Sequence, residues 1–288
     1  IILFFYGLWY FGKNLPDYKE LSQYNPNVVT RIHAGNGALL AEYAIEKRVF
    51  VPINVIPKNV INAFISAEDK DFYHHFGLDL KATLRALLTN VRNIGSGKRL
   101  IGASTITQQV AKNFLLSSEV SFERKIKEAI LAIRIERAFS KNQILELYLN
   151  EIYLGFKSYG VAAAALNYFD KSLDNLDLAE SAFLAALPKA PNNYNPIHKT
   201  KNAVYRRNWV LNQMNKNGYI NKQTKEIESN KLINIRKSSG IDEGYAPYFT
   251  EEVRKILSED KKIGSRLYTN GYSVRTTLDP LMQLYADN

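Results

Sequence analysis

Hydrophobic and polar positions divide the chain into a helical middle and two ends of different character. Between positions 57 and 230, apolar residues recur at the three- and four-residue spacing of amphipathic helices. The pattern predicts helices over 57–67, 79–93, 104–116, 121–138, 140–150, 158–168, 177–187, 199–217 and 221–229. Ser121 and Ser140 stand at the starts of two of these segments, where helix-capping residues are favoured. We therefore expect a mainly α fold.

The two ends carry turn signals instead of helical periodicity. A β-hairpin is predicted from 28–33 to 39–44, around the turn sequence Gly-Asn-Gly. A second hairpin is predicted over 267–277, around an Asn-Gly turn, in a short β-containing C-terminal linker. Residues 13–27 are polar, contain two prolines, and are typical of a stalk.

The first eleven residues, from Ile1 to Phe11, are apolar almost throughout and end in aromatic residues. A membrane-spanning helix needs about 20 apolar residues, so this segment cannot cross a bilayer alone. Its aromatic end resembles the belt where a helix leaves the membrane. We expect the end of a transmembrane anchor here, with a signal-peptide core or an N-terminal core helix as the alternatives.

The distribution of charge says more about the possible partners of the chain than its composition does. The chain carries a net charge of +10 and no cysteine, which excludes disulfides and thiolate metal sites. Residues 81–137 contain eleven Lys and Arg against four Glu, an excess of seven positive charges. Such a stretch attracts nucleic acid, anionic lipid or phosphorylated substrates. Beside a membrane anchor it favours lipid-borne phosphate, and no nucleic-acid partner is expected.

Three stretches carry candidate chemistry. The first, "SAEDKDFYHHFG" at 66–77, follows a predicted helix and combines carboxylates, histidines and aromatic rings. It could hold a metal, place a catalytic carboxylate in a partly dry pocket, or be a solvated helix end. Adjacent side chains such as His74 and His75 point apart in most backbones, so no metal site is predicted.

The second stretch, 102–113, is a predicted helix lined with short hydroxyl and amide side chains. Threonine is a poor helix former, and uncharged donors of this kind suit hydrogen bonding to a sugar or a diphosphate. In the third stretch, 121–138, helical periodicity puts Glu128 on a partly buried face near Arg124 and Lys125. Buried charges persist when they are paired, so a structural salt bridge is the alternative to a functional site.

Together the three stretches resemble a known family in order and spacing. Glu68-Asp69-x-x-Phe72-x-x-His75-x-Gly77, Gly102-x-Ser-Thr-Ile-Thr-Gln-Gln109-x-x-Lys112-Asn113 and Arg124-Lys125-x-x-Glu128 resemble the first three motifs of the peptidoglycan glycosyltransferases. This is glycosyltransferase family 51, the polymerising domain of class A penicillin-binding proteins. Further matches are Lys141-x-x-Ile-Leu-Glu146-x-Tyr-Leu-Asn150, Leu187–Asn192 and Arg206-Arg207, and the resemblance covers about residues 50–235.

The resemblance implies a lysozyme-like helical fold on the outer, periplasmic side of the cytoplasmic membrane, held by a single-pass anchor. It implies an inverting enzyme that joins lipid II to a lipid-linked growing glycan, releases undecaprenyl diphosphate and is a moenomycin target. Glu68 would be the catalytic base and Glu128 the second catalytic carboxylate. The substrate-binding residues would be Asp69, Phe72, His75, Ser104, Thr105, Gln109, Lys112, Asn113, Arg124 and Lys125.

The same resemblance sets the expected partners and cofactors. Lipid II, the growing glycan, membrane lipids and other cell-wall synthesis proteins are the expected partners. No cofactor is required by the sequence, although a divalent cation such as Mg²⁺ has a place at the diphosphate. We expect the basic stretch, the loop at 93–102 and the apolar residues Leu100, Ile101, Phe114, Leu115 and Leu116 to form one membrane-facing surface.

The predicted organisation has four parts: the end of an anchor at 1–12, a stalk and hairpin at 13–50, the glycosyltransferase domain at 51–235, and a linker at 236–288 toward an absent transpeptidase domain. Transpeptidase motifs are matched only by chance, in helix-end contexts, and no Lys-Thr/Ser-Gly sequence exists. Two other functions remain open at this stage. A lysozyme-like hydrolase also uses two carboxylates, and a non-catalytic scaffold could bind lipid-linked sugars.

Overall fold

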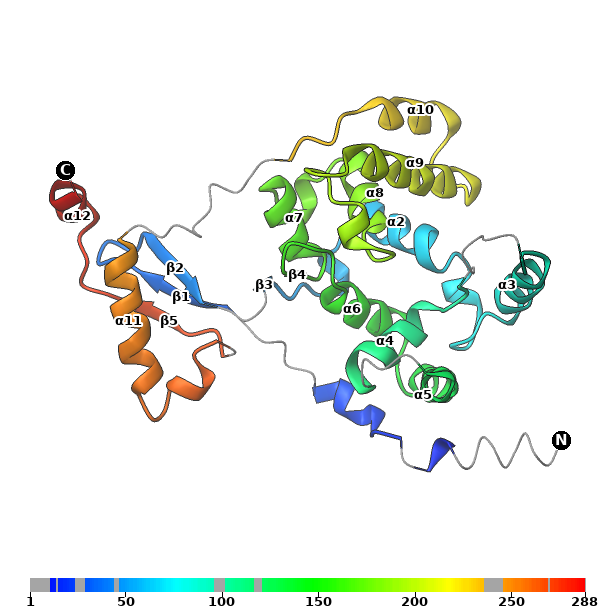
Figure 1. Ribbon diagram of the computed structural model, residues 1–288, viewed down its shortest axis with the longest axis horizontal. Helices are drawn as coiled ribbons and strands as arrows, with labels where there is room; N and C mark the ends of the chain where they lie inside the picture. The colour runs from blue at the N-terminus through cyan, green and yellow to red at the C-terminus, as the bar shows by residue number, and fades with distance from the viewer. Residues whose placement is uncertain are drawn as a thin grey trace.

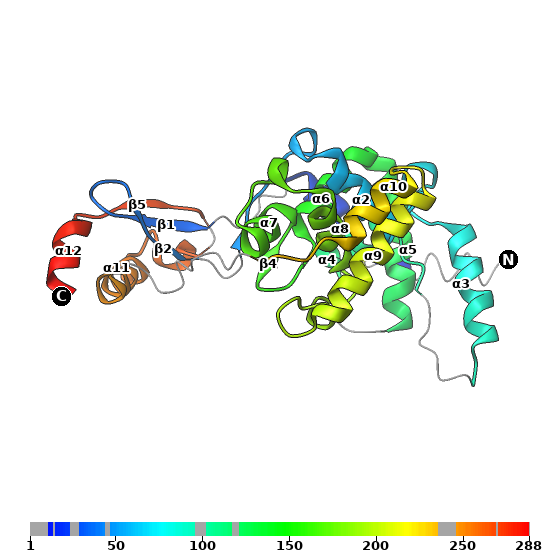
Figure 2. The same ribbon diagram turned by 90° about the horizontal axis from the view of Figure 1, so that it is seen from above.

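The computed structural model describes residues 11–13, 15–23, 29–43, 47–95, 102–116, 121–235, 246–268 and 270–287. Figures 1 and 2 show two units, a large helical domain and a smaller unit of helices and strands beside it. The helical domain contains α2 (Lys58–Glu68), α3 (Leu80–Arg92), α4 (Ile106–Leu115), α5 (Phe122–Ala138), α6 (Lys141–Glu151), α7 (Val161–Phe169), α8 (Leu178–Ala186), α9 (Thr200–Lys216) and α10 (Lys222–Asn230). Every predicted helix is present, which confirms the mainly α fold.

The centre of the helical domain is α8, which packs against α2 and α9. Its sequence, "LAESAFLAA", is apolar on nearly every side, and a helix of that kind is stable only when surrounded. Ala182, Ala185 and Ala186 are fully buried, and their small side chains let the neighbouring helices approach. The arrangement fixes the C-terminal end of α2, where Glu68 lies, relative to α9.

Three further helices, α4, α5 and α6, build the opposite side of the domain. α4 packs against both α5 and α6, so its polar face is held at a fixed distance from the end of α2. α3 differs from all of these, because none of its residues is buried. Figures 1 and 2 show α3 at one edge of the domain.

The smaller unit is built from both ends of the described chain. β1 (Thr30–His33) and β2 (Leu39–Tyr43) form the predicted antiparallel hairpin. The second predicted hairpin is wrong: β5 (Ser273–Arg275) pairs in parallel with β1 instead, giving the strand order β2-β1-β5. The edge of β1 that faces away from β2 provides the backbone hydrogen-bond partners of β5, and the local Asn-Gly turn signal gives no information about such a distant partner. α11 (Pro247–Glu259) and α12 (Pro280–Asp287) were not predicted.

The segment predicted as a stalk lies on the helical domain. A short 3-10 helix at Tyr18–Gln23 packs against α5, and Leu21 is only 5% exposed. Arg134 of α5 also donates a hydrogen bond to the carbonyl of Gly12, at 3.3 Å. The stalk prediction is therefore wrong for residues 15–23, because buried Leu21, with Leu15 and Tyr18 packed against the same core, docks this segment on the helical domain. No helix in the described residues is long and apolar enough to cross a membrane, and the predicted anchor at 1–10 lies outside them.

The motif from Lys141 to Asn150 holds the segment at 47–53, where the chain passes from the smaller unit into the helical domain. The Asn150 side chain accepts a hydrogen bond from the Val51 amide at 2.8 Å and donates one to its carbonyl at 2.9 Å. Glu146 accepts a hydrogen bond from the Ile53 amide at 2.7 Å. Next to these contacts, β3 (Lys47–Arg48) pairs in parallel with β4 (Ser158–Tyr159). This motif fastens the chain where it enters the helical domain.

Candidate active site

The loop that follows α2 is clamped between α4 and α5. Asp69 is buried, accepts a hydrogen bond from the Ile106 amide at 2.9 Å and contacts His75 Nε2 at 3.0 Å. Gly77 has a φ of +84°, and a Cβ there would lie 2.7 Å from the Ala132 carbonyl oxygen, so only glycine fits. The Thr105 hydroxyl closes the clamp by donating to the Gly77 carbonyl at 2.6 Å.

Glu68 is the last residue of α2, directly before this clamp. Gln109 of α4 donates a hydrogen bond from Nε2 to Glu68 Oε2 at 2.9 Å. Burial raises the pKa of Glu68 above its ordinary value, while the Gln109 hydrogen bond, Arg206 and Lys189 act in the opposite direction. A carboxylate with a raised pKa in a cleft is suited to accept a proton at a pH near neutrality.

Glu128 of α5 lies in a different environment. Its side chain is 1% exposed and pairs with two cations, Arg124 Nε at 3.1 Å and Lys125 Nζ at 2.5 Å. Lys125 Nζ also donates a hydrogen bond to the Ser104 hydroxyl at 3.1 Å. Burial lowers the pKa of Lys112, and Glu128 opposes that change. The result is a cation cluster, defined here as Lys112, Arg124 and Lys125, organised around one buried carboxylate.

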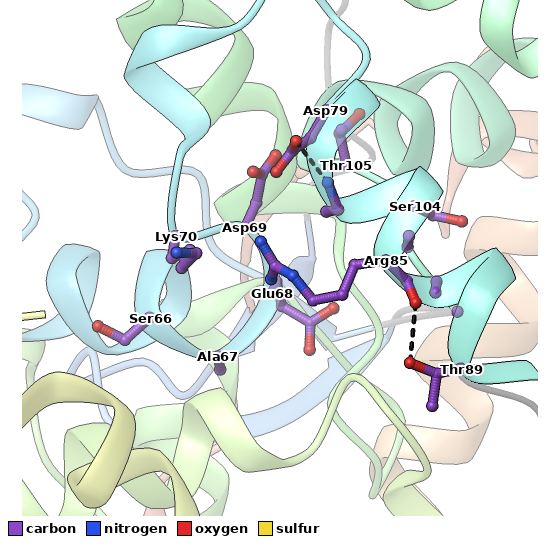
Figure 3. Close-up of a pocket in the computed structure, with 14 residues that line it drawn as sticks. Ser66, Ala67, Glu68, Asp69, Lys70, Asp79, Arg85, Thr89, Ser104 and Thr105 are labelled. Carbon is purple, nitrogen blue, oxygen red and sulfur yellow. Dashed lines mark hydrogen bonds between the residues drawn. The ribbon is translucent and has the colours of Figure 1, made fainter. Parts of the chain in front are cut away.

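Glu68 lines two cavities that lie next to each other. The larger, of about 650 Å³, also contains Gln109, Lys112, Lys125 and Glu128 on its walls. The smaller, of about 240 Å³, lies between the end of α2 and α3. Figure 3 shows the Arg85 side chain of α3 reaching across this second cavity toward Glu68 and Asp69. A carboxylate shared by two cavities can act on a molecule in one of them and a molecule in the other.

Several residues predicted to bind substrate have a different position. Phe72 is fully buried, with Lys141 Nζ 4.5 Å from its ring centroid, so its ring packs in the core and does not face the cleft. Thr105 is the buried N-cap of α4 and completes a capping box with Gln108, so it lines the smaller cavity and not the larger one. Asn113 is exposed and lines neither cavity. The residues with direct access to the larger cavity are Glu68, Ser104, Gln109, Lys112, Lys125 and Glu128.

The opposite wall of the larger cavity was not predicted as part of the site. It is formed by the segment after α8 and by α9, through Lys189, Tyr194, Arg206 and Trp209. The motifs at Leu187–Asn192 and Arg206-Arg207 were recognised in the sequence, but no role was attached to them. The signal that could have found this wall is the basic pair beside Trp209 in a helix whose other face is apolar.

These features define a class of protein: a helical enzyme whose cleft combines a half-buried carboxylate with a neighbouring cluster of cations. The transglycosylase family model matches residues 36–215, more than half of the chain. The chain belongs to the transglycosylase family, which confirms the resemblance that the sequence motifs indicated.

Individual relatives agree with this membership. Penicillin-binding protein 1A of Rickettsia felis is 48% identical over 283 residues, which cover 98% of this chain and 36% of that protein. Penicillin-binding protein 1A of Escherichia coli is 42% identical over 279 residues, covering 96% and 32%. The crystal structure of penicillin-binding protein 1A from Haemophilus influenzae matches with a TM-score of 0.54 and 28% identity, over 91% of this chain and 29% of that chain. This chain thus spans about a third of the length of these relatives.

Proposed function

We propose that this chain polymerises lipid II into β-1,4-linked glycan strands and releases undecaprenyl diphosphate, as a peptidoglycan glycosyltransferase of bacterial cell-wall synthesis. The observation that carries the proposal is the position of Glu68, which lines both cavities and has a raised pKa, with the cation cluster at one of them. A sugar hydroxyl needs a base where the two reactants meet, and a diphosphate leaving group needs positive charge beside it.

In the proposed reaction, Glu68 takes the proton from the 4-hydroxyl of the N-acetylglucosamine of an incoming lipid II. The hydroxyl oxygen forms the new β-1,4 bond to the anomeric carbon of the lipid-linked chain. The bond from that carbon to the diphosphate oxygen breaks, and the diphosphate leaves with both electrons. Lys112, Arg124 and Lys125 offset its charge as it develops, and Glu128 holds the last two of these cations in place.

The two cavities suggest where each substrate binds. The growing chain would place its diphosphate in the larger cavity, which contains Lys112 and Lys125. The incoming lipid II would present its hydroxyl from the smaller cavity, beside Arg85. A divalent cation such as Mg²⁺ would bind mainly through the diphosphate, because the described residues contain no cluster of three or more His, Asp or Glu that could hold a metal ion.

Incubation of the purified chain with lipid II in detergent, followed by sizing of the product, tests this function. Glycan strands are expected from the wild type and not from Glu68→Gln. Glu123→Gln is a matched control, because Glu123 is an exposed carboxylate of α5 that pairs with Lys127 away from the cleft. Release of reducing ends from finished peptidoglycan, with lipid II left unchanged, would instead identify a hydrolase. Lipid II binding without turnover by the wild type would identify a scaffold.

We also propose that α3 rests on the membrane surface, with the catalytic domain on the outer side of the cytoplasmic membrane. Its exposed side chains include Leu80, Leu84, Leu87, Leu88 and Val91, and the exposed Ile94 follows just after the helix. Arg85 lies on the other face, toward the smaller cavity, so α3 separates an apolar surface from the cleft. The lipid tail of a substrate in the cleft could then remain in the bilayer.

This surface differs from the one expected from the sequence. Leu115 is 9% exposed and belongs to the core, so it cannot contact lipid, and Phe114 and Leu116 are half-buried against the same core. Leu100 and Ile101 lie outside the described residues. Sequence neighbourhood suggested one surface for all of these residues, but α4 turns its apolar side inward, toward α5 and α6.

Vesicle binding tests the proposed surface. Fully burying a leucine side chain contributes about 1.5–3 kcal/mol, so Leu84→Ser with Leu87→Ser should weaken binding to phosphatidylglycerol vesicles at high salt by at least tenfold. Ile227→Ser on α10, which is also an exposed apolar position, should leave binding unchanged. Equal binding by the double variant and the wild type would exclude α3 as the membrane contact.

A further inference from the structure

Arg206 and Trp209 lie one turn apart on α9 and both line the larger cavity, on the wall opposite the cation cluster. The Arg206 guanidinium carbon lies 3.8 Å from the centroid of the Trp209 ring. A cation stacked over an indole face at this distance is attracted by the ring electrons, more strongly when water is excluded. Arg206 is 6% exposed, so this condition is met.

The next residue shows how unusual this arrangement is. Arg207 is buried too, and its guanidinium donates hydrogen bonds to the carbonyls of Lys231 and Ser229 and to Asn208 Oδ1, at 2.8–2.9 Å. Arg206 has no ion pair with a carboxylate among the described residues, and its buried Nε has no hydrogen-bond partner there. Backbone carbonyls hold the Arg207 guanidinium by hydrogen bonds, whereas the Arg206 guanidinium is held by stacking on the Trp209 ring.

The charge held in this way acts on Glu68. Burial raises the pKa of Glu68, and Arg206 opposes that change; burial likewise lowers the pKa of Arg206, and Glu68 opposes that change. The other groups that act on Glu68 or respond to it come from each surrounding element: Gln109 and Lys112 of α4, Lys189 after α8, Tyr148 of α6 and the adjacent Asp69. Tyr194 and Tyr205 act on Arg206.

We propose that Trp209 is a positioning residue, whose indole ring holds the Arg206 guanidinium in the cleft as an unpaired cation facing Glu68. An ion pair would neutralise this cation, and a hydrogen-bonded clamp would turn it toward the backbone, as happens with Arg207. Stacking leaves the charge intact and the guanidinium edge open to the cavity. The catalytic consequence rests on the proposed function of Glu68, but the arrangement of the three residues does not.

The catalytic test compares Trp209→Leu, which removes the ring, with Trp209→Phe, which keeps an aromatic face. In Trp209→Leu the Arg206 charge is no longer held near Glu68, so the acid limb of the pH dependence of kcat should move to higher pH. The expected change is about half a pH unit, a fraction of the ~1–3 pKa units by which a close opposite charge lowers the pKa of a carboxyl group. Trp209→Phe should restore most of the wild-type profile. Tyr219→Leu is the control, because Tyr219 is an aromatic residue just after α9 that is 40% exposed, lies outside the cavity, and is not among the groups that act on Arg206 or Glu68. An unchanged limb in Trp209→Leu, or an equal change in Trp209→Phe, would overturn the proposal.

A second readout needs no turnover. The chain contains two tryptophans, Trp9 and Trp209, so Trp9→Phe leaves Trp209 as the single tryptophan of the whole protein, which is excited selectively at a wavelength that tyrosine does not absorb. Its emission should change with pH as Glu68 gains or loses its charge, and this transition should disappear in both Glu68→Gln and Arg206→Met. A transition that persists in either variant would contradict the coupling. If the wild type fails to polymerise lipid II, the proposed function fails, while the fluorescence titration still decides whether Trp209 and Arg206 face Glu68.

Discussion

Glu68 and Glu128 are the same residue type on neighbouring walls of one cavity, yet their surroundings differ in kind. Glu128 has two cations within ion-pairing distance and almost no exposure. Glu68 has a neutral amide as its hydrogen-bond donor, and its nearest opposing charges act without an ion pair. Two carboxylates in environments of this kind are suited to different tasks. Glu128 orders its two cations, while Glu68 is able to exchange a proton.

The largest expected effect separates the two carboxylates directly. General-base catalysis contributes about 10²–10⁴-fold, so Glu68→Gln should lose at least a hundredfold in polymerisation rate. Because the cation cluster is intact in this variant, its affinity for a diphosphate-mimicking inhibitor such as moenomycin should change little. A folded Glu68→Gln protein with near-normal polymerisation would remove Glu68 from the mechanism.

A smaller effect is expected from removing one of the cations that pair with Glu128. Removing a charge-assisted contact costs about 1.5–3 kcal/mol, so Lys125→Ala should lower both turnover and moenomycin affinity by about one to two decades. Lys127→Ala is the matched control on the same helix, since Lys127 pairs with Glu123 outside the cavity. A change in thermal stability alone would favour the structural salt bridge that the sequence left open.

The smallest expected effect concerns the hydrogen bond that distinguishes Glu68. Gln109 donates to the carboxylate and so favours its charged form, which lowers the pKa of Glu68. Gln109→Leu should therefore raise that pKa and move the acid limb of the kcat profile upward by about one pH unit. Activity should recover at higher pH, where Glu68 is again deprotonated. A loss of activity that is equal at every pH would mean that Gln109 contacts substrate instead.

Local patterns predicted most of the helical domain, because each of its helices has its own apolar periodicity and cap. The site was partly predictable for the same reason. Glu128 lies with Leu131 and Ile135 on the buried face of α5, where its helical position had indicated a partly buried one. Contacts between distant segments were not predictable in this way. β5 pairs with a strand more than 200 positions earlier, and the docking of the residue 15–23 segment depends on three apolar side chains, Leu15, Tyr18 and Leu21, spread through a polar segment.

The loop after α2 shows the same limit. The resemblance implied that Phe72, Asp69 and His75 bind substrate. In the structure Asp69 and His75 contact each other and Phe72 fills the core, while Asp69 also lines the smaller cavity beside Glu68. The cavity wall that the sequence did not predict, from Lys189 to Trp209, lies near Glu68 because α8 and α9 pack on α2.

The pH dependence of kcat, measured for the wild type and for the residual activity of Glu68→Gln, tests the role of Glu68 most directly. The wild type should show an acid limb of unit slope at a pH above the ordinary glutamate pKa of about 4.3, because burial raises the pKa of this carboxyl. The residual rate of Glu68→Gln should be flat over the same range. If the same limb persists in Glu68→Gln, another group accepts the proton and Glu68 is not the base.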